Sequence, residues 1–191
     1  MTLNRNVMKY ESFEINDKAI YIIDDEIEKD LVDNFYEQIQ TLAFVKGEKD
    51  FDGDKYPIFS VDFDVEKFET SNLFAQKAAF LIERFYADHQ YQMRRAYINL
   101  SNYGDVEFPH SDCREDENDL TVVYYVNKFW DYRWGGETIF YENHESKRCV
   151  LPKPGRFLIF PGAVEHLGSI STRICTESRL TMAIKYKQIS S

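Results

Sequence analysis

His110 and Asp112 lie two residues apart and have side chains that commonly bind metal ions. Residues i and i+2 of an extended segment point to the same side, so this imidazole and carboxylate can reach one ion. Two neutral imidazoles and one carboxylate on one face of a metal make the non-haem iron site that activates dioxygen. The other interpretation of His110 and Asp112 is a hydrogen-bonded pair at the edge of a loop.

The second imidazole of such a site must come from a distant strand. The chain has 4 histidines. His89 ends a predicted helix and His144 lies in a polar turn, so we expect both at the surface. His166 follows the predicted strand that ends at Phe160. We therefore predict that His110, Asp112 and His166 are the metal ligands and the catalytic group.

The first 92 residues contain the predicted helices. Residues 1–18 are polar and favour a lead-in or edge strand, and 19–23 favour a buried strand that ends at Asp24-Asp25. One of these aspartates is expected to cap the helix that follows. Hydrophobic residues then recur every three or four positions, which predicts one helical face. They are Ile27, Leu31, Phe35, Ile39 and Leu42. A second helix is predicted from Leu73 to Tyr86.

Residues 46–70 show no helical period and mix acidic with aromatic side chains. We predict a long irregular segment with a short strand around 58–63. Long loops that carry aromatic residues are often lids or binding loops. The alternative is an ordinary excursion whose aromatic residues pack on the core.

From residue 93 the hydrophobic pattern changes to a period of two. The predicted strands are 96–100, 120–127, 138–141, 148–151, 156–160 and 179–187, and glycine, proline or asparagine turns separate them. Short strands with no helix between them predict an antiparallel sandwich or barrel. The fold class is therefore mainly β with N-terminal helices (α+β). We predict a single domain, 1–191, with a helical support region at 1–92 and the strand-rich core at 93–191.

Several motifs follow one another in a fixed order from Asn102 to Lys187. They are Asn102-Tyr103-Gly104, His110-Ser111-Asp112, the strand 120–127, Gly135-Gly136-Glu137-Thr138-Ile139-Phe140, the segment 152–160, His166 and Arg179. In this order they resemble the Fe(II)/2-oxoglutarate-dependent dioxygenase superfamily, specifically its prolyl 4-hydroxylase-like branch. The resemblance covers nearly half of the chain.

The resemblance implies a double-stranded β-helix, or jelly roll, supported by the two helices, with the metal between its sheets. It implies Fe(II), 2-oxoglutarate as cosubstrate and dioxygen, with ascorbate as a further candidate. 2-Oxoglutarate would chelate the iron and pair its far carboxylate with Arg179, because arginine offers a bidentate fork to a buried carboxylate.

Other side chains are candidates for the same cosubstrate pocket. Thr181 shares a strand face with Arg179. Tyr125 matches a tyrosine that donates its hydroxyl group to the same carboxylate in the family, and Tyr103 and Tyr97 are further candidates. Packing in the core is the alternative for each tyrosine.

The chain departs from the family pattern between His166 and Arg179, where the interval is longer than usual. Arg173 lies inside this insertion and is the rival of Arg179 for the 2-oxoglutarate contact. We prefer Arg179 because residues 179–184 have the pattern of the final core strand.

The activity implied is hydroxylation of a C–H bond, coupled to oxidative decarboxylation of 2-oxoglutarate to succinate. The substrate would be a prolyl residue of a peptide or protein, or alternatively a free amino acid or other small metabolite. Substrate contacts are expected in 46–70, 112–119 and 129–134. The hypothesis from a different class is a non-catalytic jelly-roll binding module.

Bulk composition limits the partners. The 191 residues carry a formal charge of -10, which disfavours nonspecific binding to nucleic acid or anionic lipid. The 3 cysteines do not form a disulfide framework pattern, and no apolar run reaches the ~18 residues of a membrane-spanning helix. We therefore expect a cytoplasmic protein with no membrane partner. The oligomeric state is not predictable from these features.

Overall fold

The structure, a computed structural model, describes residues 8–189 and contains two antiparallel sheets and three helices. Residues 1–7 of the predicted lead-in, 1–18, lie outside this range. The helices are α1 (Lys29–Ile39), α2 (Val65–Ser71) and α3 (Leu73–Phe85). The strands are β1 (Lys9–Ile15), β2 (Lys18–Asp24), β3 (Val45–Glu48), β4 (Ile58–Asp62), β5 (Gln90–Ser101), β6 (Leu120–Tyr125), β7 (Thr138–Glu142), β8 (Glu145–Val150), β9 (Phe157–Pro161), β10 (His166–Gly168) and β11 (Arg179–Ile189). A short 3-10 helix covers Tyr132–Trp134.

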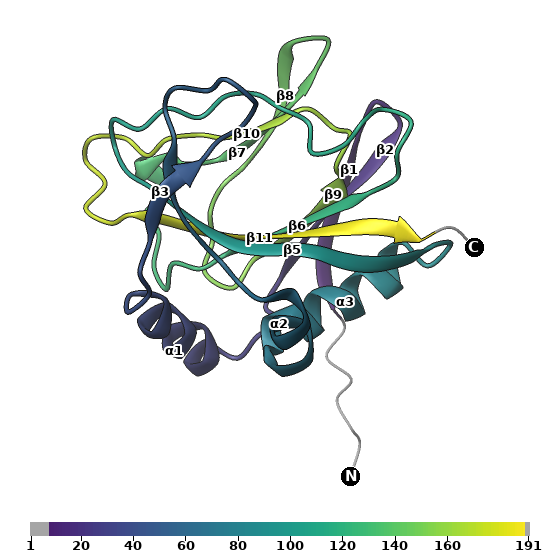
Figure 1. Cartoon of the computed structure of the whole chain (residues 1–191), viewed down its shortest axis with the longest axis horizontal. Coiled ribbons are helices and arrows are strands. Elements are labelled where there is room, and N and C mark those ends of the chain that lie inside the picture. The colour runs from purple at the N-terminus through teal and green to yellow at the C-terminus, as the bar shows by residue number, and fades with distance from the viewer. Residues whose placement is uncertain (1–7, 190–191) are drawn as a thin grey trace.

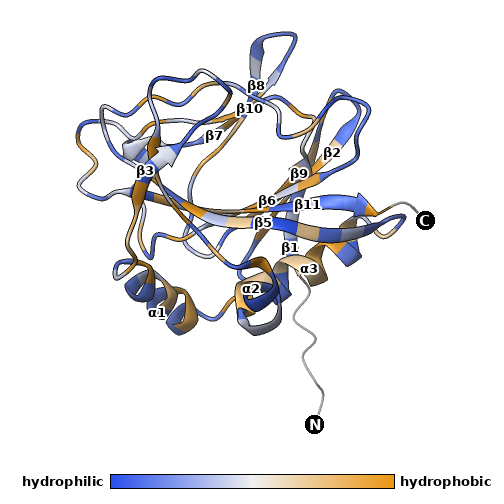
Figure 2. Ribbon diagram, in the orientation of Figure 1, coloured by the Kyte–Doolittle hydropathy of each residue, from blue (hydrophilic) through white to orange (hydrophobic). Residues whose placement is uncertain are grey.

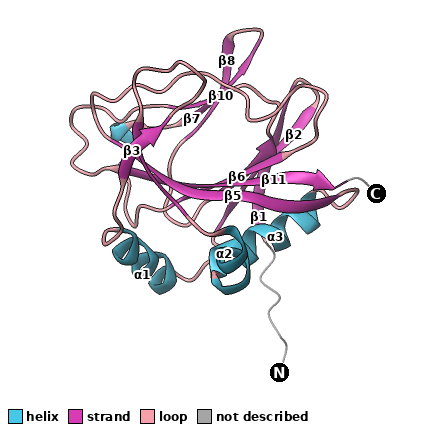
Figure 3. Ribbon diagram, viewed as in Figure 1, coloured by secondary structure: helices cyan, strands magenta, loops and turns pink. Residues whose placement is uncertain are grey.

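The larger sheet has eight strands in the order β1-β2-β9-β6-β11-β5-β4-β3, and the smaller sheet has the order β10-β7-β8. The helices cover one face of the larger sheet, while the smaller sheet lies on its other side (Figures 1 and 3). This arrangement is the predicted jelly roll with helical support. The N-terminal half also extends the sheet, because β2 pairs with β9 and β4 pairs with β5. The division into regions at residue 92 stays a prediction.

Strand β11 shows how the sheet separates the core from the functional face. Side chains alternate across a strand, so Leu180, Met182 and Ile184 point to one side and Arg179 and Lys185 point to the other. The three apolar residues belong to the hydrophobic cluster under the helices. The two cations line a cavity on the opposite face. The alternation along β11 therefore places apolar side chains in the core and cationic side chains in the cavity.

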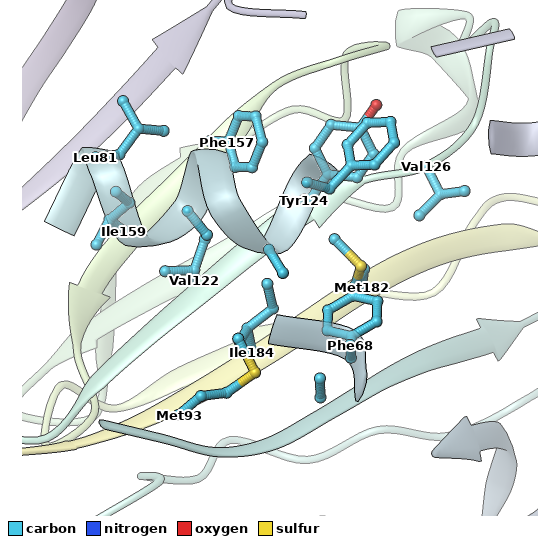
Figure 4. Close-up of a cluster of buried hydrophobic side chains, with 14 of the residues drawn as sticks. Phe68, Leu81, Met93, Val122, Tyr124, Val126, Phe157, Ile159, Met182 and Ile184 are labelled. Atoms are coloured by element: carbon cyan, nitrogen blue, oxygen red, sulfur yellow. The ribbon is translucent and has the colours of Figure 1, made fainter. Parts of the chain in front are cut away.

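The cluster under the helices is the main core of the protein. The rings of Phe35 in α1 and Phe74 in α3 stack with their centroids 4.1 Å apart, and Tyr124 of β6 packs against both. Figure 4 shows side chains of the sheet, including Phe157 and Met182, around the helix that carries Leu81. Each such buried side chain contributes about 1.5–3 kcal/mol relative to an exposed one. Both blue and orange segments occur along α1, as a helix with one buried face requires (Figure 2).

Two predictions about the first helix need correction. The buried face of α1 is Val32, Phe35 and Ile39, whereas Leu31 is 42% exposed. The N-cap residue is Glu28, which makes no side-chain capping bond, so neither Asp24 nor Asp25 caps the helix. Asp24 instead accepts hydrogen bonds from Lys153 and Arg156 near β9.

The prediction that residues 46–70 are irregular was wrong for part of the segment. Strands β3 and β4 form a hairpin. β4 corresponds to the short strand predicted at 58–63, whereas β3 was not predicted. Helix α2 then begins after Asp64, whose side chain accepts from Lys67 N. The helix has only 7 residues and buries only Phe68, so it is too short to show a hydrophobic period. Residues 8–189 therefore contain three α-helices where two were predicted.

Within residues 8–189, no helix combines the length and the apolar character needed to cross a membrane.

Candidate functional site

The backbone brings the two predicted histidine ligands together. His110 and His166 face each other in an isolated antiparallel bridge, and each backbone N–H donates to the other residue's carbonyl oxygen at 2.9 Å. Asp112 N donates to Gly162 O at 2.7 Å, which holds the next ligand against the same neighbouring segment. The alternation in 110–112 therefore places an imidazole and a carboxylate beside the second imidazole, as the spacing predicts.

The three side chains form a compact donor set. One ligand atom from each of His110, Asp112 and His166 lies within 4.8 Å of the other two. Asp112 Oδ1 is 3.6 Å from His110 Nε2, and Asp112 Oδ2 is 3.5 Å from His166 Nε2. Nδ1 of His110 and Nδ1 of His166 each lie 2.9 Å from a backbone carbonyl oxygen. A carbonyl only accepts, so Nδ1 carries the proton and the Nε2 lone pair is available for a metal.

The charge state of these groups also fits a divalent metal. Burial lowers the pKa of His166 to about 4, which keeps its imidazole neutral near pH 7. Burial alone would raise the pKa of Asp112, but Lys185, His166 and Thr121 outweigh it and hold the pKa well below its usual range. Two neutral imidazoles and one carboxylate are the donor set that suits non-haem Fe(II). The residues present therefore fit the metal that the sequence implies.

Two residues that the sequence analysis did not single out fix the carboxylate. Thr121 Oγ1 donates to Asp112 Oδ2 at 2.5 Å, and Lys185 Nζ forms an ion pair with the same oxygen. Burial opposes the charge of Lys185, but Asp112 outweighs this effect and raises the lysine pKa. Lys185 lies on the same face of β11 as Arg179, Thr181 and Ala183. The alternation in the sequence could therefore have predicted that Lys185 points toward the cavity.

The loop between β3 and β4 contacts the segment that carries the ligands. Asp50 Oδ2 accepts from Phe108 N at 2.5 Å, and Asp50 Oδ1 lies 3.5 Å from His110 Nδ1. The ring centroids of Phe51 and Tyr56 lie 5.4 and 6.2 Å from that of Phe108. Part of the aromatic segment 46–70 thus packs beside the candidate metal centre rather than on the main core.

Arg179 lies in the same cavity as the three candidate ligands. The cavity has a volume of about 350 Å³ and is lined by strands of both sheets. Arg179 is 3% exposed, and its Nε donates to Gly136 O at 2.7 Å while Nη1 lies 3.4 Å from Thr181 Oγ1. Arg173 is exposed on the insertion. The structure therefore brings Arg179 and Thr181, rather than Arg173, into the cavity of the three candidate ligands.

The predicted tyrosines are placed differently from one another. Tyr97 lines the cavity. Tyr125 is 1% exposed, and its hydroxyl group bonds Thr138 Oγ1 at 2.8 Å and Val150 O at 3.3 Å. Its ring lies 6.0 Å from the Arg179 guanidinium carbon. Tyr103 is 65% exposed and does not line the cavity, so the structure does not bring it to the site.

The cavity also contains polar atoms that lack partners, as a pocket for a polar molecule should. Asn99 Oδ1 and Glu107 Oε1 are buried without a hydrogen-bond partner among the described residues, and both residues line the cavity. Arg179 can donate to a carboxylate of 2-oxoglutarate, which only accepts, whereas Asn99 Oδ1 and Glu107 Oε1 are acceptors that need a donor or a proton of their own. No motif marks Glu107, so the sequence analysis missed it.

Comparisons with known proteins agree with this geometry. The sequence profile of the 2OG-Fe(II) oxygenase superfamily matches residues 98–186, which include all three candidate ligands and Arg179. No curated protein matches the sequence of the chain.

Solved structures of low sequence identity share the fold. A prolyl hydroxylase from Trichoplax adhaerens, in complex with a hypoxia inducible factor peptide fragment, has a TM-score of 0.69 at 17% identity, over 88% of this chain and 83% of that one. The viral collagen prolyl hydroxylase of Paramecium Bursaria Chlorella virus-1 has a TM-score of 0.67 at 13% identity, over 99% and 100%. HygX from Streptomyces hygroscopicus, with nickel and 2-oxoglutarate bound, has a TM-score of 0.61 at 13% identity, over 88% and 82%.

Proposed function

We propose that the chain, a 2-oxoglutarate-dependent dioxygenase whose residues 98–186 match the 2OG-Fe(II) oxygenase superfamily, hydroxylates a C–H bond at the centre formed by His110, Asp112 and His166. The observation that carries this proposal is the common cavity of these three side chains and Arg179. In this assignment the two imidazoles and the carboxylate hold Fe(II), and Arg179 binds the far carboxylate of 2-oxoglutarate.

The bound iron and 2-oxoglutarate would supply the oxidising power that inserts one atom of dioxygen into the substrate C–H bond, while the other enters succinate as carbon dioxide leaves. The chain's own part is to bind and orient. The backbone bridge between His110 and His166 fixes the two imidazoles. Thr121 and Lys185 fix the carboxylate of Asp112. Such support of metal ligands maintains both affinity and geometry.

The first candidate substrate is a prolyl residue of a peptide or protein. The motif order of the prolyl 4-hydroxylase-like branch supports it, as does the shared fold of prolyl hydroxylases, one of which was solved with a peptide.

A small polar metabolite or free amino acid is the second candidate. The cavity is lined by charged side chains of both signs, including Glu48, Arg94 and Lys187, which suit a zwitterion. Incubation with proline-containing peptides and with free amino acids, followed by mass spectrometry for one added oxygen atom, distinguishes the two substrate classes. The cytoplasmic location stays a prediction, and the unpaired state of Cys113, Cys149 and Cys175 is compatible with it.

The test of the chemistry has two stages. Without air, Fe(II) and 2-oxoglutarate should give the metal-to-ligand charge-transfer absorption band of a chelated keto acid, and admitting air should then yield succinate. We expect Asp112→Ala to lose both signals, because the carboxylate ligand is removed. A wild-type protein without the band, or an unchanged band in Asp112→Ala, would sink the proposal. Iron binding with no turnover of 2-oxoglutarate would instead support the non-catalytic jelly-roll module.

A further inference from the structure

We propose that Glu107 is a second binding residue for 2-oxoglutarate, whose protonated carboxyl group donates a hydrogen bond to the same far carboxylate that Arg179 binds. This inference rests on the proposed function, because it assumes that the cosubstrate lies against Arg179. It goes beyond that function by linking the binding of 2-oxoglutarate to the protonation of Glu107. None of the family motifs contains Glu107.

Gly168 shows that Glu107 and Arg179 approach the same point. A Cβ atom built on Gly168 would lie 2.6 Å from Glu107 Oε2 and 3.3 and 3.4 Å from Arg179 Nη1 and Nη2. Real Cβ atoms essentially never make contacts under 3.0 Å, so a side chain at position 168 would displace the Glu107 carboxyl group. The carboxyl group and the guanidinium therefore converge on the β10 backbone from two different segments of the chain.

Although they converge, Glu107 and Arg179 do not form an ion pair in the part of the chain that the structure describes. Arg179 instead donates to Gly136 O and contacts Thr181. Glu107 Oε1 is buried without a hydrogen-bond partner among residues 8–189. An unpaired buried carboxyl oxygen is costly, which favours a partner that arrives with the ligand. A carboxylate bound in the cavity that both residues line would supply this partner.

The surroundings of Glu107 favour its neutral form. Burial raises the pKa of Glu107 to about 7, the positive charge of Arg179 opposes this rise, and the negative charges of Asp50 and Asp105 add to it. The neutral hydroxyl group of Ser101 also opposes the rise in the Glu107 pKa, but burial outweighs both opposing effects. A carboxylic acid that is kept neutral can donate a hydrogen bond, whereas an ionised one would repel a second carboxylate.

Binding should therefore be linked to a proton. The cosubstrate carboxylate favours the protonated form of Glu107, so the complex takes up a proton at a pH above about 7. The affinity for 2-oxoglutarate should fall as the pH rises from 6 to 8.5, by up to roughly tenfold per pH unit above the pKa. The carboxylates of 2-oxoglutarate remain ionised across this range and do not contribute.

The experiment is calorimetric titration of 2-oxoglutarate into the anaerobic Fe(II) protein at pH 8, in two buffers of different ionisation enthalpy. The difference between the two heats gives the number of protons taken up. Wild type should take up most of one proton, whereas Glu107→Gln should take up none and keep a pH-independent affinity, because the amide donates without titrating. Glu107→Ala should bind more weakly than Glu107→Gln at every pH. Glu66→Gln, an exposed acid on α2, is the matched control and should behave as wild type.

Two outcomes separate this inference from the proposed function. If Arg179→Met abolishes 2-oxoglutarate binding but Glu107→Gln takes up protons as wild type does, the role of Glu107 is wrong and the proposed function stands. If Arg179→Met binds 2-oxoglutarate as wild type does, the cosubstrate does not lie against Arg179 and both proposals fail. A thermal unfolding curve of each variant without cosubstrate establishes that it is folded, so that lost binding is not lost structure.

Discussion

The two carboxylate oxygens of Asp112 have different surroundings. Oδ2 accepts from Thr121 and pairs with Lys185, while Oδ1 faces His110 Nε2 at 3.6 Å. Hydrogen bonds to a ligating carboxylate fix its orientation and tune its basicity. Thr121 and Lys185 thus hold the side chain of Asp112 through Oδ2. This leaves Oδ1 available to bind a metal and favours a single bond from Asp112 to the ion.

We predict that Thr121→Val weakens metal binding without disrupting the fold. Valine keeps the shape of this buried residue but removes the hydroxyl group that orients Asp112. Loss of such a supporting group typically costs about 10–100-fold in metal affinity. Anaerobic titration with Fe(II) or Co(II) measures this change. Thr41→Val, whose exposed hydroxyl group contacts only the helix backbone, should leave the affinity unchanged. Equal affinities in wild type and Thr121→Val would contradict the role of Thr121.

Side chains that belong to a motif could be predicted, and those defined only by three-dimensional proximity could not. His110, Asp112, His166 and Arg179 have a recognisable order in the sequence, and the structure places them in one cavity. Glu107 could not be predicted because its burial arises from contact with β10, which is distant in the chain. Tyr103 belongs to the motif but is exposed. Motif membership therefore does not by itself place a side chain in the pocket.

At the scale of elements, a cluster of charges joins β2 to the turn before β9. Arg156 Nε and Nη2 bind the two oxygens of Asp24 at 2.8 and 2.9 Å, and Lys153 Nζ binds it at 2.8 Å. Burial alone would raise the pKa of Asp24, but the bonds from Arg156 and Lys153 outweigh it and lower the pKa. This cluster reinforces the backbone pairing of β2 with β9, by which the N-terminal hairpin joins the sheet.

We predict that Asp24→Asn lowers the free energy of unfolding by about 2 kcal/mol at pH 7, because hydrogen bonds to charged groups are worth about 1.5–3 kcal/mol. A depressed carboxyl pKa stabilises the fold above the unfolded pKa of about 3.9 and loses this effect as the pH falls through the folded pKa. The difference between wild type and variant should therefore shrink below about pH 4. Urea unfolding at pH 7 and pH 3 tests this, and a difference that is constant with pH would contradict it.

Elements with a long hydrophobic period were predictable, and short ones were not. β5 and β11 alternate over enough residues to show a period of two, β9 is a short apolar run, and most of the bounds predicted for β5, β6, β9 and β11 agree with the structure. β10 has 3 residues and exists because it pairs with β7 across the chain, so local sequence carries little signal for it. Helix α2 is similarly short and is fixed by the burial of Phe68 beneath β5.

At the scale of the whole molecule, the candidate metal centre joins segments that the folded chain brings together. His110 and Asp112 follow β5, while His166 begins β10 of the other sheet. An ion held by all three therefore binds the folded state and has no equivalent site in the unfolded chain. Its binding free energy adds to the stability of the entire fold.

We predict that a redox-stable divalent ion such as Mn(II) raises the melting temperature of the protein. At 100 times its dissociation constant, a ligand that binds only the native state adds about 2.7 kcal/mol. For a chain of this size that corresponds to roughly 5–10 °C. Differential scanning fluorimetry with and without a chelator measures the shift, and Asp112→Ala should abolish most of it. An equal shift in wild type and Asp112→Ala would indicate that the ion binds elsewhere.

The paired backbones of His110 and His166 have a consequence for the biogenesis of the enzyme. During synthesis, a nascent chain exposes His110 and Asp112 well before His166 and its strand leave the ribosome. Two ligands on a flexible segment hold a divalent ion poorly, and the bridge that orients both imidazoles requires β10. Iron held by His110, Asp112 and His166 would therefore bind only after the jelly roll closes. An incomplete chain without His166 would therefore lack the complete ligand set. It could not form an oxidising centre while the cavity is still open.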